Sequence, residues 1–128
     1  MTIDYAAATD LLDRYGRAWE AFDGDAWVAL FSEHAEYHED PFEPPLVGHN
    51  QIRAYLLEAS RTQDQVEFTV ERHWVAGSTV LAAWHASFVR RGTRARVRLA
   101  GFLTLEVGSD GRIERLHEWW HRRETDAG

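Results

Sequence analysis

The spacing of hydrophobic residues changes from helical to alternating after Thr62, and this change constrains the fold more than any other feature. Before Thr62, apolar residues recur at steps of three and four over residues 3–23 and 49–60, with a short helix between them at Trp27. After Thr62, apolar and polar residues alternate in four long segments, as they do in half-buried strands. These segments begin at Val66, Val80, Arg94 and Ile113, and in the first of them one face holds Val66, Phe68, Val70, Arg72 and Trp74.

Helices followed by a meander of long strands predict an α+β fold. We expect a cone-shaped roll in which three N-terminal helices pack on a strongly curved, mostly antiparallel sheet. Residues 35–40 add a short strand, and the Pro- and Gly-containing residues 41–48 are a predicted loop. A chain of 128 residues suits one domain, spanning residues 1–128. Because the sheet must curl around the helices, its concave face should enclose a pocket.

Composition excludes several classes of partner. The net charge of −7 and the pI near 5.4 argue against a nucleic acid or an anionic membrane surface. The sequence holds no apolar run of about 20 residues, the length that a membrane-spanning helix needs. Its start, Met1-Thr2-Ile3-Asp4, lacks the basic and then apolar pattern of a signal peptide, so we expect a cytoplasmic protein.

The residue types present narrow the chemistry to Asp, Glu, His, Tyr and Arg. The absence of Cys excludes thiolate nucleophiles and sulfur-ligated metals, and all 14 basic residues are Arg, which excludes lysine Schiff bases. The pairs His34/His38 and His117/His121 have a spacing that would join two metal ligands on a helix. They lie in extended segments, where residues four apart are separated by about 13 Å. We therefore predict neither a metal nor a cofactor.

Short motifs in the first half of the chain resemble the corresponding run in bacterial ketosteroid isomerases. The motifs are Arg14-Tyr15, Gly24-Asp25, Val28-Ala29-Leu30-Phe31, Asp40-Pro41, Gly48 and Ile52-Arg53. With the order of the elements, they make the whole chain similar to the nuclear transport factor 2-like superfamily, and within it to SnoaL-like and ketosteroid-isomerase-like proteins. That superfamily hosts isomerases, cyclases, hydratases, epoxide hydrolases and non-catalytic binders, so the resemblance implies a fold more firmly than an activity.

The resemblance also assigns site residues. Asp40 falls where the isomerases hold their proton-shuttling carboxylate, and Tyr15 where they hold a tyrosine that donates to the oxyanion. Their second oxyanion donor, a protonated acid, aligns with Gly101, so that group is missing. Epoxide hydrolases of this fold use an Arg-x-Asp pair on a strand, and Arg98-Leu99-Ala100 lacks the acid.

Alternation along the last strand adds a third candidate, Glu118. Leu116, Glu118 and Trp120 share one strand face, and aligning the Gly111-Arg112-Ile113 turn with the proteins that the chain resembles implies that this face lies in the pocket. A buried carboxylate is costly unless it is paired or protonated. Glu118 is therefore either a second catalytic acid beside Asp40 or the partner of an inward arginine such as Arg72. Asp40 has its own alternative, which is to end a strand by accepting bonds from nearby amides, and Glu39 is predicted to face solvent.

Aromatic and apolar residues are predicted to form the ligand-binding wall. They are Trp19, Trp27, Phe31, Tyr55, Trp84, Phe88, Leu103 and Trp120. Aromatic walls favour flat, apolar ligands. We therefore expect a cofactor-free isomerase or cyclase that transfers a proton on an apolar, cyclic carbonyl compound. The alternatives are a non-catalytic module that binds a small hydrophobic metabolite and a pocket filled by its own tryptophans.

The other face of the sheet combines arginine and aromatic side chains. Its predicted members are Arg94, Arg96, Arg98, Phe102, His117 and Trp119. Such a mixed surface suits a protein interface. Proteins that the chain resembles commonly pair through this face, which implies a homodimer.

Overall fold

The computed structural model describes residues 2–126 and begins with three helices. Helix α1 (Tyr5–Ala21) starts after Asp4, whose side chain accepts a hydrogen bond from the Ala7 amide at 2.7 Å. Its buried stripe includes Leu11 and Tyr15, as the helical spacing predicts. Helix α2 (Gly24–Ala29) and helix α3 (Gly48–Thr62) follow. No helix in residues 2–126 is long and apolar enough to cross a membrane.

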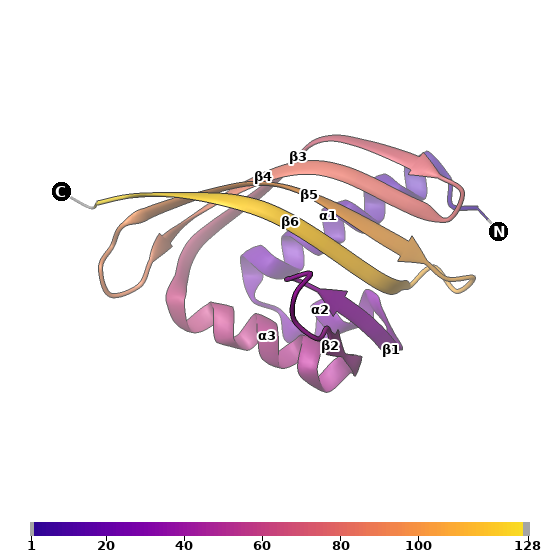
Figure 1. Ribbon diagram of the computed structural model, residues 1–128, viewed down its shortest axis with the longest axis horizontal. Helices are drawn as coiled ribbons and strands as arrows, with labels where there is room; N and C mark the ends of the chain where they lie inside the picture. Colours follow the sequence, from indigo (N-terminus) through magenta and orange to yellow (C-terminus); the bar gives the residue numbers. More distant parts are fainter. Residues whose placement is uncertain (1, 127–128) are drawn as a thin grey trace.

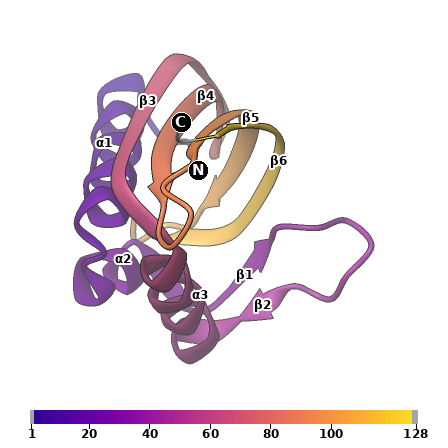
Figure 2. The ribbon, with the colours of Figure 1, turned by 90° about the vertical axis from the view of Figure 1, so that its left-hand side faces the viewer.

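Six strands form one sheet in the order β2-β1-β6-β5-β4-β3. Their bounds are β1 Phe31–His38, β2 Leu46–Val47, β3 Gln63–Ala76, β4 Thr79–Arg90, β5 Arg96–Val107 and β6 Ile113–Thr125. All neighbours are antiparallel except β1 and β6, which run parallel. The sheet curls without closing, with α1 along β3 and α3 below the concave face (Figures 1 and 2). The predicted α+β architecture is confirmed. Within the predicted loop 41–48, however, Leu46 and Val47 form a short strand against β1.

A bulge in β3 corrects the predicted alternation of this strand. The register with β4 shifts between Val70 and Arg72, which places one extra residue in β3 and exchanges its two faces. Phe68 is buried on the concave side, whereas Trp74 is 41% exposed and packs against Phe102 on the outer side. The guanidinium of Arg72 lies over the ring of Trp74. Arg72 is thus unable to pair with an inward carboxylate.

Arg94 also departs from its predicted place on the outer strand face. It precedes β5, in a turn, with a positive φ of 62°. Its guanidinium donates to Asp64 Oδ2 at 3.1 Å, and Arg91 contacts the same carboxylate. Arg96 and Arg98 are exposed on β5 itself. The outer face therefore keeps two of the three predicted arginines.

Candidate functional site

A cavity of about 280 Å³ lies between the concave face of the sheet and helices α1 and α3. Its walls are mainly aromatic, and charged side chains lie among them. The lining aromatic residues are Tyr15, Trp19, Trp27, Tyr37, Tyr55, Trp84, Phe88 and Trp120. This volume is close to the lower end of the range for ligand pockets, roughly 300–1,000 Å³. The cavity therefore suits a small ligand of one or two rings.

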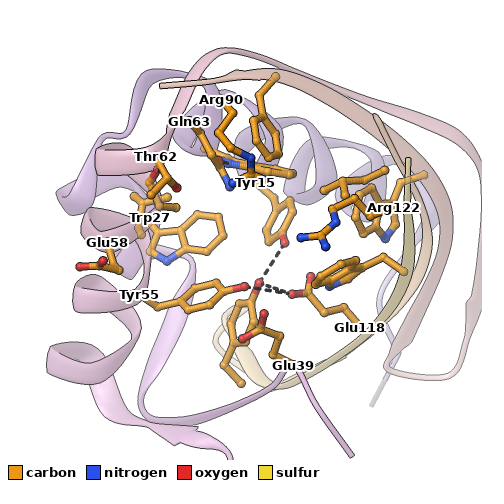
Figure 3. A pocket seen from close by; sticks show the side chains of 18 residues that line it. Tyr15, Trp27, Glu39, Tyr55, Glu58, Thr62, Gln63, Arg90, Glu118 and Arg122 are labelled. Carbon is orange, nitrogen blue, oxygen red and sulfur yellow. Dashed lines mark hydrogen bonds between the residues drawn. The ribbon is translucent and has the colours of Figure 1, made fainter. Parts of the chain in front are cut away.

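Glu118 is the one charged side chain among residues 2–126 that is buried, with 6% of its surface exposed. It lies on β6 opposite Leu103 of β5, on the concave face that alternation predicts. The Tyr37 hydroxyl donates to Glu118 Oε1 at 3.0 Å, and the Tyr55 hydroxyl lies 3.5 Å from the same oxygen. The hydroxyls of Tyr15 and Tyr37 are 3.3 Å apart. Figure 3 shows Tyr15, Tyr55 and Glu118 converging on one point of the cavity.

Burial decides the electrostatics of this cluster. The pKa of Glu118 is raised from 4.5 to about 7, chiefly by burial. The nearby charge of Glu39 acts in the same direction, while hydrogen bonds from Tyr37, Tyr55 and Tyr15 oppose the change. Burial also raises the pKa of Tyr15, Tyr37 and Tyr55, and the charge of Glu118 adds to this effect. The tyrosines therefore stay protonated donors near neutral pH. Glu118 can be either a base or an acid there.

Asp40 does not line this cavity with Tyr15, but it lines a neighbouring hollow together with Tyr37 and Glu118. It is exposed, and its Oδ1 accepts a hydrogen bond from the Phe42 amide at 2.9 Å. This is the turn-forming alternative for the residue. Strand β1 ends at His38, so strand alternation does not extend to the next two residues. As a result Glu39, although exposed and predicted to face solvent, lines the mouth of the cavity.

Most of the predicted wall residues line the cavity. Those that do so are Trp19, Trp27, Tyr55, Trp84, Phe88 and Trp120. Phe31 and Leu103 do not, because both are fully buried in the core. Glu118 does not pair with Arg72, the arginine considered for it. Its Oε1 instead lies within hydrogen-bond distance of the Tyr37 and Tyr55 hydroxyls.

Sequence reasoning missed Tyr37, the donor closest to Glu118. It shares a buried strand face with Ala35 in β1, so alternation within that short strand could have predicted that Tyr37 points inward. Arg122 was also missed, although it continues the inward series of Glu118 and Trp120. Arg90 and Glu58 line the mouth as well.

The position that aligns with the second oxyanion donor, Gly101, is occupied by a neighbouring ring. A Cβ on Gly101 would lie 2.6 Å from Cζ2 of Trp84 and 2.6 Å from the Trp119 carbonyl oxygen. Trp84 faces Gly101 across the β4–β5 pair. Its buried Nε1–H has no acceptor among residues 2–126. No three His, Asp or Glu side chains gather at metal-binding geometry in the same described part of the chain.

Comparisons with known proteins agree with this architecture. The family model of the SnoaL-like domain matches residues 12–116. No curated protein matches the sequence.

Solved structures with the same fold include three whose names refer to chemistry. A putative isomerase from Bacillus subtilis has a TM-score of 0.80 at 20% identity, over 91% of this chain and 88% of its own. The epoxide hydrolase/cyclase-like enzyme SalBIII of pyran ring formation in salinomycin has a TM-score of 0.79 at 20% identity, over 92% and 93%. An epoxide hydrolase of the LEH-like type from M. tuberculosis has a TM-score of 0.75 at 20% identity, over 91% and 84%.

Proposed function

This chain belongs to the SnoaL-like family, and on that basis we propose that it is a cofactor-free isomerase or cyclase that acts by proton transfer. Its substrate class is a small, ring-containing carbonyl compound with an apolar body. Glu118 takes the role of the catalytic base, and Tyr15 is the donor to developing negative charge. We assign Asp40 no catalytic role, because it lines a neighbouring hollow and not this cavity, and its Oδ1 accepts a hydrogen bond from a backbone amide.

One observation carries the proposal: a buried carboxylate with a pKa of about 7 lies in an aromatic cavity against tyrosine hydroxyls. A base works best when its pKa is near the working pH, because it is then partly ionised and still strongly basic. An ordinary exposed glutamate, with a pKa near 4.3, would be a much weaker base.

The proposed step moves a proton between two carbons by way of Glu118. Ionised Glu118 removes the proton next to the carbonyl group, so the C–H bond breaks and an O–H bond forms on Glu118. The electron pair moves to the carbonyl oxygen, and the Tyr15 hydroxyl donates a hydrogen bond to the resulting oxyanion. Return of the proton to another carbon completes an isomerisation. Attack of the enolate carbon on a second carbonyl carbon of the same molecule instead closes a ring. The C=O π electrons of that carbonyl move to its oxygen, which takes the proton from Glu118.

The relatives support the reaction class without fixing the substrate. Structures of this fold include a putative isomerase and an epoxide hydrolase/cyclase-like enzyme, at 20% identity to this chain. Acid–base chemistry in one cavity is common to these reactions.

Proton exchange tests the proposal without knowledge of the substrate. Small ring ketones are incubated with the protein in D₂O, and NMR follows deuterium entry next to the carbonyl group. We expect the wild-type protein to accelerate exchange and Glu118→Gln to lower the rate by at least about 10²-fold, the usual scale of a positioned acid–base group. Asp40→Asn is the matched control and should exchange at the wild-type rate. Loss of exchange in the control but not in Glu118→Gln would contradict the assignment.

A non-catalytic binding module is the second candidate, and Gly101 favours it. A single tyrosine donor stabilises an oxyanion less well than a pair, and loss of one donor typically lowers the rate by about 10²–10³-fold. If this candidate is correct, ketones raise the melting temperature of the wild-type protein and of Glu118→Gln equally, and neither protein accelerates exchange.

A further inference from the structure

Arg122 brings a positive charge to the mouth of the cavity. It follows Glu118 and Trp120 at alternate positions of β6, so all three side chains share the concave face. Leu99 lies opposite Arg122 on β5 and lines the cavity beside it. The guanidinium points inward among the lining side chains, on the sheet side of the cavity (Figure 3).

No carboxylate neutralises Arg122 within residues 2–126, whereas its neighbour Arg90 is neutralised. Arg90 lines the same mouth, and its Nε and Nη2 donate to the carboxylate of Glu124 at 2.9 to 3.3 Å. Arg122 forms no ion pair in that part of the chain and affects Glu124 only through longer-range attraction. One guanidinium is thus free to pair with a bound anion.

The charges at the mouth are separated in space. Arg90 and Arg122 come from strands β4 and β6, while Glu39 follows β1 and Glu58 lies on α3. Figure 3 shows the two arginines and the two glutamates on different sides of the cavity. An anion beside Arg122 therefore gains the attraction of the guanidinium while it stays away from both exposed carboxylates.

The spacing along β6 limits the size of the ligand. Glu118 and Arg122 are four residues apart, a Cα separation of roughly 13 Å in an extended strand. The inward side chain of Arg122 spans part of this length, so a ligand that contacts both residues must be small. The cavity volume of about 280 Å³ sets the same limit.

We infer that the cavity binds a small ring-containing carboxylate. Its carboxylate group pairs with Arg122, and its apolar ring lies on Trp120 and Leu99, so that the far end of the ring reaches Glu118. Arginine suits this task, because its planar fork matches the two oxygens of a carboxylate. The inference rests on the proposed function in one respect, namely that the reacting carbon lies at Glu118. Arg122 is then the residue that selects acidic substrates over neutral ones.

Binding of a matched pair of probes tests this selection. Isothermal titration calorimetry at pH 6 compares 2-naphthoate, an anion, with 2-naphthamide, its neutral counterpart of the same shape. We expect wild-type protein to bind naphthoate about tenfold more tightly than naphthamide, the low end for a charge-assisted contact at a partly exposed site. Arg122→Gln should remove this preference and leave naphthamide binding unchanged. Arg123→Gln, which removes the same charge from the next residue of β6, should retain it.

Three results would overturn the inference: no binding of either probe, equal binding of both by wild-type protein, or an equal loss in the two arginine variants. The experiments can contradict the proposed carboxylate site and the proposed enzyme activity independently of each other. If naphthoate binding depends on Arg122 but no ketone exchange occurs, the carboxylate site stands and the proposed enzyme does not. If Glu118 proves essential for exchange while Arg122→Gln binds both probes as wild-type protein does, the enzyme stands and the anion site does not.

Discussion

At the scale of single residues, the buried carboxylate of Glu118 links the stability of the fold to pH. Its pKa in the folded protein, about 7, is above the ordinary value of 4.5, so the folded state holds the proton more tightly than the unfolded state does. The resulting stabilisation is complete below pH 4.5 and is lost as the pH rises through about 7. The difference between the two pKa values corresponds to about 3 kcal/mol.

We therefore predict that wild-type protein loses up to about 3 kcal/mol of unfolding free energy between pH 5 and pH 8 through this one group. Glu118→Gln, which stays neutral throughout, should show a correspondingly smaller loss. Urea unfolding at the two pH values measures both proteins. Equal losses would mean that Glu118 is ionised and stabilised in the folded protein, and the electrostatic basis of the proposed base would then be absent.

Tyr37 is predicted to tune the same carboxylate. Its hydroxyl donates to Glu118 at 3.0 Å, and this bond lowers the pKa of Glu118 by favouring the charged form. Tyr37→Phe should therefore raise that pKa by roughly one pH unit, as expected for one hydrogen bond to a charged group. The measurement is a ¹³C NMR titration of the Glu118 carboxyl group. Tyr5→Phe, at an exposed tyrosine on the first turn of α1, is the control and should leave the titration unchanged.

At the scale of secondary-structure elements, alternation located side chains well inside long strands and failed where strands end or change register. Glu118 lies on β6 at its predicted face, because the turn at Gly111 fixes the phase of a regular strand. Asp40 lies outside the main cavity because β1 ends at His38, and a bulge exchanges the faces of β3 after Val70. Hydrophobic alternation within one segment does not show where that segment stops pairing with a distant strand, because the end of the pairing also depends on the partner strand.

Gly101 provides a test of how closely β4, β5 and β6 pack at the cavity wall. A Cβ there would meet the ring of Trp84 and the Trp119 carbonyl oxygen, both at 2.6 Å, and the carbonyl cannot move unless its strand moves. We predict that Gly101→Ala lowers the unfolding free energy by about 1–3 kcal/mol, the usual cost of overpacking. Chemical denaturation measures it. Ala100→Val enlarges the exposed neighbour on the same strand and should change stability by less than about 0.5 kcal/mol. A stable Gly101→Ala protein would show that the wall can relax, and an acid could then be introduced at this position.

At the scale of the whole molecule, the curl of the sheet creates two unlike surfaces. The concave surface faces the helices (Figure 2). It holds the cavity, while the convex outer surface carries exposed aromatic side chains. Trp119 is 48% exposed and Trp74 41% exposed, and Phe102 packs against Trp74 between them. Arg96 and Arg98 lie on the same surface. Large aromatic residues with arginine at their edge are the usual composition of a protein interface.

We propose that a second copy of the chain covers this outer surface. A two-fold pair brings the same patch of both copies together, so the aromatic residues of each copy can pack against those of the other. We predict a dimer in sedimentation velocity at micromolar concentrations and a monomer for Trp119→Glu, because that change places a charge of the same sign on both sides of the interface. Leu57→Glu is the control, because Leu57 is 47% exposed on helix α3, on the concave side of the sheet (Figure 2), and this change should leave the dimer intact. If wild-type protein sediments as a monomer, or if both variants dissociate equally, the outer surface is not the interface.

Because the cavity opens on the opposite face of the sheet, Trp119→Glu should retain ligand binding even as a monomer, which separates assembly from the chemistry proposed at Glu118.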